Sequence, residues 1–142
     1  MPTAMHEKFI DNVKYDIVSQ LKAIGDSVDV ARYIGSVGSA DIKFEDSRHS
    51  PDAQFKYMNS RYPHLVIEVS YSQKQKDLPY LADDYIVESN GSIGVVIGLD
   101  IEYRGTGRAM LQMWRPTVKN EGGERYLESQ RTISEVRMCV RY

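Results

Sequence analysis

Two acidic residues near the middle of the chain are the strongest candidates for chemistry. Asp52 follows Pro51 at the start of an extended segment, and Glu68 lies sixteen residues later inside the run 65–71. An ionised carboxylate in a half-buried strand is unfavourable unless it is paired or binds a cation. If the two segments are neighbouring strands, both carboxylates converge at one end and form a site for a hard, oxygen-seeking cation such as magnesium.

The run 65–71 has the composition of a buried strand that carries one acidic side chain. Successive side chains of a strand point to opposite faces of the sheet. Glu68 therefore shares its face with Val66 and Ser70, and the opposite face carries Leu65, Ile67, Val69 and Tyr71.

Each acidic residue also has a simpler interpretation. Asp52, next to a proline, is a residue type that favours turns. Glu68 can form a salt bridge with Lys43 or Lys56 if these lie on adjacent strands, although acidic residues between apolar strand neighbours are uncommon. These alternatives stay open at the level of sequence.

The wider pattern resembles a known superfamily. A Pro-Asp pair, a spacer, and then a glutamate in an apolar strand followed by a polar residue two places on resembles the PD-(D/E)XK nucleases. The segment from Tyr62 to Leu78 looks like restriction-endonuclease-like proteins found in many fungal genomes, and it also resembles a related bacterial group. We expect this similarity to run from about His6 to Trp114.

The resemblance implies a fold and an activity. The expected fold is α/β, a restriction-endonuclease-like core with a central mixed sheet flanked by helices in the order α-β-β-β-α-β, plus a C-terminal hairpin. The implied activity is metal-dependent phosphodiester hydrolysis with Mg²⁺ or Mn²⁺. Asp52, Glu68 and the carbonyl of Val69 would bind the cation. In some members an acidic residue of the first helix joins them, which here would be Glu7, but Glu7 also suits a helix start as a simple dipole partner.

One position departs from the superfamily pattern. Its lysine, two residues after the glutamate, is replaced by Ser70. Lys74 is the first candidate to supply the charge and Lys76 the second. Gln73 and Ser70 can position a water by hydrogen bonding but cannot supply charge. In the related bacterial group a lysine comes from the following helix, where this chain has Leu81.

Basic residues near these motifs are candidates for phosphate contacts. The candidates are Arg48, Lys56, Arg61 and Lys74. The formal net charge of −2 gives no general attraction to nucleic acid, so a binding surface has to be a local basic patch. We expect DNA as the partner, with RNA as a second candidate, and a homodimer by analogy with enzymes that cut two strands. The alternatives are an inactive nuclease-fold domain that binds nucleic acid or protein, and a dimerising interaction domain.

Composition sets the remaining limits. The chain has 142 residues, of which 42% are hydrophobic and 27% charged, which predicts a single globular domain over 1–142. Cys139 is the one cysteine, so no intramolecular disulfide forms, and an intracellular location in the nucleus or cytoplasm fits. No apolar run is long enough to cross a bilayer, so no membrane partner is expected.

Apolar periodicity and turn residues predict the elements that position these residues. A helix capped by Asp77 should present Leu81 and Tyr85 inward and Asp83, Asp84 and Glu88 outward. His6, His49 and His64 show no metal-ligand spacing and are expected at the surface or in packing. Helices are expected at 6–24 and 77–89, strands at 28–36, 40–45, 53–57, 65–71, 92–103, 108–114 and 134–141, a polar loop at 46–51, a hairpin loop at 104–107, and a linker-like stretch at 120–124. The strands that contain Leu65 and Ile93 should be parallel.

Overall fold

A computed structural model describes residues 8, 11, 12, 15, 34–36, 41–57, 60–71, 77–101 and 108–139. Residues 8, 11, 12 and 15 are helical, as predicted for this part of the chain. The rest of that predicted helix, including Glu7, lies outside the described residues. So do the predicted hairpin loop 104–107 and the connection 72–76, which contains Gln73, Lys74 and Lys76.

Six of the described strands form one large mixed sheet, so the predicted mixed α/β class is confirmed. The strand order is β1 (Ile34–Ser36), β4 (Ala53–Tyr57), β5 (Leu65–Tyr71), β6 (Val95–Ile101), β7 (Arg108–Glu121) and β8 (Glu124–Cys139). Strands β5 and β6 are parallel, as predicted, and every other neighbouring pair in this order is antiparallel.

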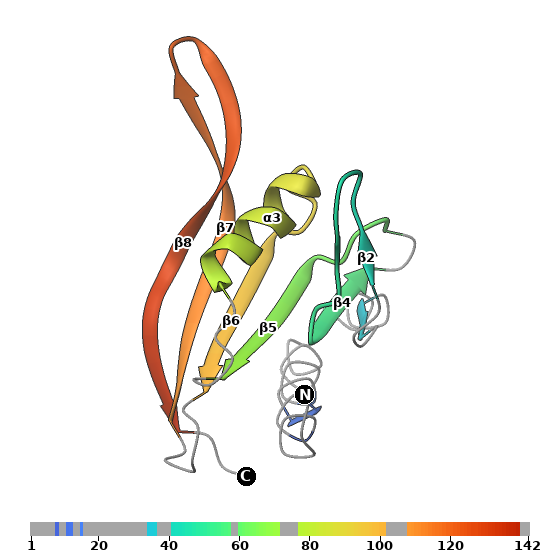
Figure 1. The fold of residues 1–142 in the computed structure, drawn as a ribbon, viewed down its shortest axis with the longest axis vertical. Helices are drawn as coiled ribbons and strands as arrows, with labels where there is room; N and C mark the ends of the chain where they lie inside the picture. The colour runs from blue at the N-terminus through green and yellow to red at the C-terminus, as the bar shows by residue number, and fades with distance from the viewer. Residues whose placement is uncertain are drawn as a thin grey trace, which may run out of the picture.

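The helix α3 (Leu78–Glu88) connects the two parallel strands and lies across one face of the sheet (Figure 1). Its start is fixed by Asp77, whose side chain accepts a hydrogen bond from the backbone N–H of Tyr80 at 3.1 Å. Its end is fixed by the turn at Asn90 and Gly91, where φ is 54° and 80°. Positive φ favours these two residue types, so the local sequence sets both ends of the helix.

Alternation along the strands produces two apolar clusters on opposite faces of the sheet. The cluster beneath α3 joins Val66, Val96 and Trp114 of the sheet to helix residues that include Ala82 and Ile86. The other cluster contains Ala53, Phe55, Ile67, Val69, Leu99 and Ile101. Glu68 alternates with Ile67 and Val69, so its side chain lies on the face that α3 covers.

A second, two-stranded sheet replaces two of the predicted features. The predicted strand 40–45 is reduced to β2 (Ile42–Lys43), and part of the predicted polar loop forms its partner β3 (Arg48–His49). The chain turns between them because the backbone N–H of Phe44 donates to the carbonyl of Ser47 at 2.8 Å. Phe44 is buried in the cluster beneath α3, which anchors this small sheet beside the helix.

The C-terminal third of the described chain is a long hairpin that extends past the other strands (Figure 1). The predictions of a strand end at Trp114–Pro116, of a linker at 120–124, and of a strand only from 134 are wrong, because β7 and β8 pair continuously around Gly122 and Gly123. The two glycines adopt φ of 57° and 83°, which suits a two-residue hairpin turn. Strand β6 pairs with β7 only as far as Trp114, so Pro116 has a strand on one side, where proline is tolerated.

No helix within the part of the chain that the structure describes combines the length and apolar character needed to cross a membrane.

Gly98 provides a test of the packing between α3 and the sheet. A Cβ atom at Gly98 would lie 2.9 Å from the Trp114 ring and 3.0 Å from a methyl group of Leu78. We therefore expect Gly98→Ala to lower the free energy of unfolding by about 1–3 kcal/mol through overpacking. Urea denaturation followed by circular dichroism measures the change.

Gly94→Ala is the matched control, because a Cβ there meets nothing closer than a backbone oxygen at 3.9 Å. It should change the free energy of unfolding by less than about 1 kcal/mol. Equal losses in the two variants would contradict the close approach of helix and sheet at Gly98.

Candidate active site

The two predicted acidic residues occupy neighbouring positions on paired strands. Ala53 of β4 is the antiparallel partner of Ile67 of β5, and continuing this register by one residue sets Asp52 beside Glu68. The half-buried side chain of Asp52 accepts a hydrogen bond from the backbone N–H of Val69 at 2.7 Å. The strand pairing therefore brings Asp52, Glu68 and Val69 together at one end of β4.

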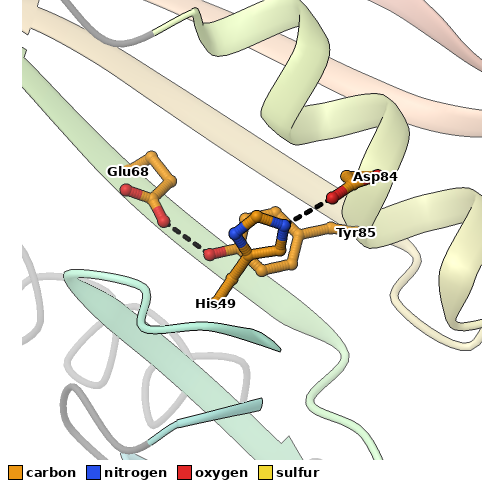
Figure 2. A network of polar contacts seen from close by, with 4 residues as sticks. All are labelled: His49, Glu68, Asp84 and Tyr85. Atoms are coloured by element: carbon orange, nitrogen blue, oxygen red, sulfur yellow. Dashed lines mark hydrogen bonds and ion pairs between the residues drawn. The ribbon is translucent and has the colours of Figure 1, made fainter. Parts of the chain in front are cut away.

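Glu68 lies in the interior, where a tyrosine from α3 binds it. The Tyr85 hydroxyl donates to Oε1 of Glu68 at 2.6 Å, and the two residues are 0% and 3% exposed (Figure 2). This bond explains how a carboxylate persists between apolar neighbours. Lys43, one of its two predicted partners, belongs to the small sheet and not to a strand adjacent to β5.

Three carboxylates act on the same phenol. Burial raises the pKa of Tyr85 well above its ordinary value, and the charge and hydrogen bond of Glu68 raise it further. The charges of Asp52 and then Asp84 add to the effect in the same direction. Tyr85 therefore stays protonated and remains a hydrogen-bond donor at any pH at which the chain is folded.

A histidine–aspartate pair lies beside this tyrosine. Nε2 of His49, from β3, pairs with Oδ2 of Asp84, from α3, and the His49 ring centroid lies 5.3 Å from that of Tyr85 (Figure 2). His49 lies in packing, one of the two places expected for it, while Asp84, predicted to point outward, is paired and only partly exposed. Both side chains are about one-fifth exposed, because the small sheet packs against the helix at this point.

The chemistry of the pair determines which ring nitrogen of His49 carries the hydrogen. A carboxylate only accepts hydrogen bonds, so Nε2 of His49 carries the hydrogen and the other ring nitrogen, Nδ1, is the one that exchanges a proton when the ring is neutral. A carboxylate held against an imidazole also stabilises the imidazolium form. The arrangement is suited to accepting a proton at Nδ1.

The position where the superfamily carries lysine offers no positive charge. Ser70 is 2% exposed and lies on the same face of β5 as Glu68. The candidate replacements Lys74 and Lys76, together with Gln73, lie outside the described residues, as does Glu7.

The predicted phosphate-binding residues occupy separate places around the site. Arg48 lies on β3 next to His49 and pairs with Asp41 at 3.6 Å. Lys56 lies on β4, half-buried. Arg61 is exposed and lies over the Tyr62 ring, 5.1 Å from its centroid.

A groove of about 390 Å³ lies beside the end of α3. It is lined by Glu45, Arg61, Tyr62, Glu88, Ser89, Asn90 and Ser92. Among the described residues that line it, Arg61 is the one cation and lies with two carboxylates, so these residues give the groove no net preference for a phosphate. It does not include the acidic pair on β4 and β5.

The donor set at the acidic pair fits a hard divalent cation. Within the described ranges, no group of three or more His, Cys, Asp and Glu side chains is arranged to enclose a metal ion. Magnesium does not require such a cage, since it is commonly held by one or two carboxylates and completes its coordination with water and substrate phosphate. The carboxylates of Asp52 and Glu68, with the carbonyl of Val69, offer oxygens of this type.

Sequence reasoning missed four polar residues of this site: His49, Gln54, Asp84 and Tyr85. For Tyr85 a signal was present, because it falls on the inward face of the helix, and a buried phenol needs an acceptor. Gln54 could have been placed by alternation, since it is the antiparallel partner of Val66 and so shares the face of Glu68. Nothing in the sequence connects His49 to Asp84, which are thirty-five residues apart.

Comparison with known proteins adds no assignment: no family model matches the chain, and no curated protein matches it.

Removing the Tyr85 hydroxyl tests the buried bond. We expect Tyr85→Phe to lower the free energy of unfolding by about 1–3 kcal/mol, because the Glu68 carboxylate loses its donor. Tyr80→Phe on the same helix is the matched control, since Tyr80 is 62% exposed, and it should change stability by less than about 0.5 kcal/mol. Similar losses in both variants, measured by urea denaturation, would show that the bond contributes nothing.

The raised pKa of Tyr85 predicts a loss of stability at alkaline pH. The unfolded chain gives up this proton at about pH 10, whereas the folded chain retains it. The contribution of Tyr85 to stability is therefore constant below about pH 10 and falls above it, by up to about 1.4 kcal/mol per pH unit. Urea denaturation between about pH 9 and about pH 11 should show a shallower fall in Tyr85→Phe than in wild type or Tyr80→Phe. Parallel curves for all three proteins would contradict this prediction.

Proposed function

We propose that the chain is a divalent-cation-dependent phosphodiester hydrolase of the PD-(D/E)XK kind that acts on nucleic acid. The observation that carries this proposal is the antiparallel register of β4 and β5, which sets Asp52 beside Glu68 on the face of the sheet beneath α3. The sequence resemblance identified the same two residues from their spacing alone. A pair of acidic residues on adjacent strands is the minimal protein contribution to a magnesium site that also uses substrate phosphate.

The topology around the pair supports the same proposal. The glutamate strand β5 is antiparallel to the aspartate strand β4 and parallel to β6, with α3 as the connection between β5 and β6. This β-β-α-β portion corresponds to part of the order that the resemblance implied and supports the proposed restriction-endonuclease-like core.

The residues of the site have distinct tasks in this proposal. Asp52, Glu68 and the Val69 carbonyl hold the cation, which when bound neutralises charge on the scissile phosphate and activates a water. The backbone N–H of Val69 orients Asp52, and the Tyr85 hydroxyl orients Glu68, so neither carboxylate has to be ordered when the cation arrives. Fixed donors of this kind reduce the reorganisation that binding requires.

The substrate proposed is DNA, with RNA as the second candidate. The net charge of −2 means that local groups must contact the phosphates, and Arg48, Lys56, Arg61 and Lys74 are the residues proposed for this. A homodimer in which two such sites act on the two strands of a duplex remains part of the proposal by analogy.

Two observations favour a second candidate function, an inactive nuclease-fold domain that binds nucleic acid or a protein partner. The lysine position is held by the buried Ser70, and the Tyr85 hydroxyl occupies one oxygen of Glu68. Both features would also suit a site that has kept its fold and lost its chemistry.

Cation binding and cleavage separate these functions. We expect Mg²⁺ or Mn²⁺, titrated by calorimetry, to bind the wild-type chain, and Asp52→Asn or Glu68→Gln to weaken binding by at least about tenfold. Asp46→Asn is the matched control, because Asp46 is an exposed carboxylate in the loop between β2 and β3 and should bind as wild type does. Cleavage of duplex DNA, single-stranded DNA and RNA is then measured with each cation.

The outcomes point to different functions. Binding with cleavage that both substitutions abolish supports the hydrolase. Binding without cleavage of any of the three substrates supports the inactive domain. An absence of binding at about 10 mM cation, well above the dissociation constants of ordinary protein sites for such ions, would overturn the proposed hydrolase.

A further inference from the structure

We propose that His49, oriented by Asp84, is the general base that takes a proton from the attacking water, in the place of the lysine that the sequence lacks at position 70. This inference rests on the proposed function, because it assigns the proton acceptor of the same site. It is carried by the His49–Asp84 pair and by the position of that pair against Tyr85 and Glu68.

The contacts form a continuous chain from the acidic pair to the histidine. Glu68 accepts from the Tyr85 hydroxyl, the Tyr85 ring lies against the His49 ring, and His49 pairs with Asp84. Figure 2 shows the tilted rings of His49 and Tyr85 between the two polar contacts, with Asp84 on one side and Glu68 on the other. The second ring nitrogen of His49 lies on the ring edge away from Asp84.

Access to water distinguishes His49 from the other groups in the network. The side chains of His49 and Asp84 are 21% and 20% exposed, whereas Tyr85 and Glu68 are buried. A general base has to receive a proton from substrate water and return it to solvent. Tyr85 cannot do this because it stays protonated, and Ser70 cannot because a hydroxyl is not basic at neutral pH.

Charged and titratable groups face His49 from several elements. Asp84 and the neutral Tyr85 face it from α3, Glu68 lies behind Tyr85 on β5, and Asp52 acts on the same phenol from the start of β4. On its own small sheet, Arg48 is drawn toward Asp41, and Lys43 is the strand partner of Arg48.

The proposed step is balanced in atoms and charge. Neutral His49 takes one proton from a water at Nδ1 as the oxygen of that water bonds to phosphorus. The bond between phosphorus and the leaving ester oxygen breaks, and that oxygen takes a proton from solvent. His49 then releases its proton to solvent, and the net reaction is one phosphodiester and one water giving a phosphomonoester and an alcohol.

The test is the pH dependence of cleavage by the cation-loaded chain. The wild-type rate should rise with pH, because only a neutral imidazole can accept the proton of the attacking water. His49→Gln keeps an amide that can donate to Asp84 but cannot accept a proton from water, so the rate should fall by about 10²–10⁴-fold and the rise should disappear. Asp84→Asn should lower the rate and displace the rise, and His64→Gln, which changes an exposed histidine elsewhere, should behave as wild type does.

Chemical rescue separates a proton-transfer role from a structural one. In His49→Gly, added imidazole should restore part of the rate in proportion to the concentration of its neutral form, while binding of Mg²⁺ measured by calorimetry stays as in wild type.

A His49→Gln rate equal to that of wild type, or a pH dependence that His49→Gln leaves unchanged, would overturn this inference. If Asp52→Asn and Glu68→Gln still abolish cleavage in that case, the proposed function stands; if those two variants cleave normally, the proposed function itself fails. A wild-type chain that binds the cation but cleaves none of the substrates overturns both.

Discussion

The buried hydrogen bond between Tyr85 and Glu68 is the constraint on which the rest of the site depends. A carboxylate that is 3% exposed is several kcal/mol unfavourable without a partner, and a phenol that is 0% exposed also requires one. Each group supplies what the other lacks, because Tyr85 remains a donor and Glu68 remains an acceptor. The bond requires a particular height of α3 above β5 and a particular rotation of the helix about its axis. The same placement packs Ala82 and Ile86 against the sheet, so the apolar packing and the geometry of the site depend on each other.

Three consecutive residues of α3 bind three different strands, which fixes that rotation. Asp83 accepts from the backbone N–H and the hydroxyl of Ser129 on β8, at 3.3 and 3.1 Å. Asp84 pairs with His49 on β3, and Tyr85 bonds to Glu68 on β5. Because successive helix residues are rotated by about 100°, three neighbours can point in three directions. A helix held in this way cannot turn to satisfy one contact without breaking the other two.

The predictable and unpredictable parts of the structure differ in the range of the interactions that determine them. Strand β5, helix α3 and strand β6 follow from local signals: an apolar run, the cap at Asp77 and the turn at Asn90 and Gly91. The neighbouring positions of Asp52 and Glu68 follow from one assumption, that two adjacent extended segments pair. His49 could not be assigned, because its role depends on a small sheet with two-residue strands that carry almost no periodic signal. The predicted strands of the hairpin were too short, because proline and paired glycines usually end a strand. Here Pro116 lies where β7 has a strand on one side, and Gly122 and Gly123 form the turn between β7 and β8.

The residues of the site come from two separate parts of the fold, and a substitution in one part can leave the other part unchanged. The acidic pair belongs to the sheet: a slip of one residue in the pairing of β4 and β5 would carry Asp52 or Glu68 to the opposite face, into the cluster around Ile67 and Val69. The residues proposed to transfer the proton, Asp84 and His49, belong to the helix and to the small sheet packed beside it. A change at Asp84 or His49 therefore leaves the register of the acidic pair intact. A serine at position 70 is compatible with the proposed hydrolase for this reason, since the residues proposed to bind the cation and the residue proposed to accept the proton are held by different parts of the fold.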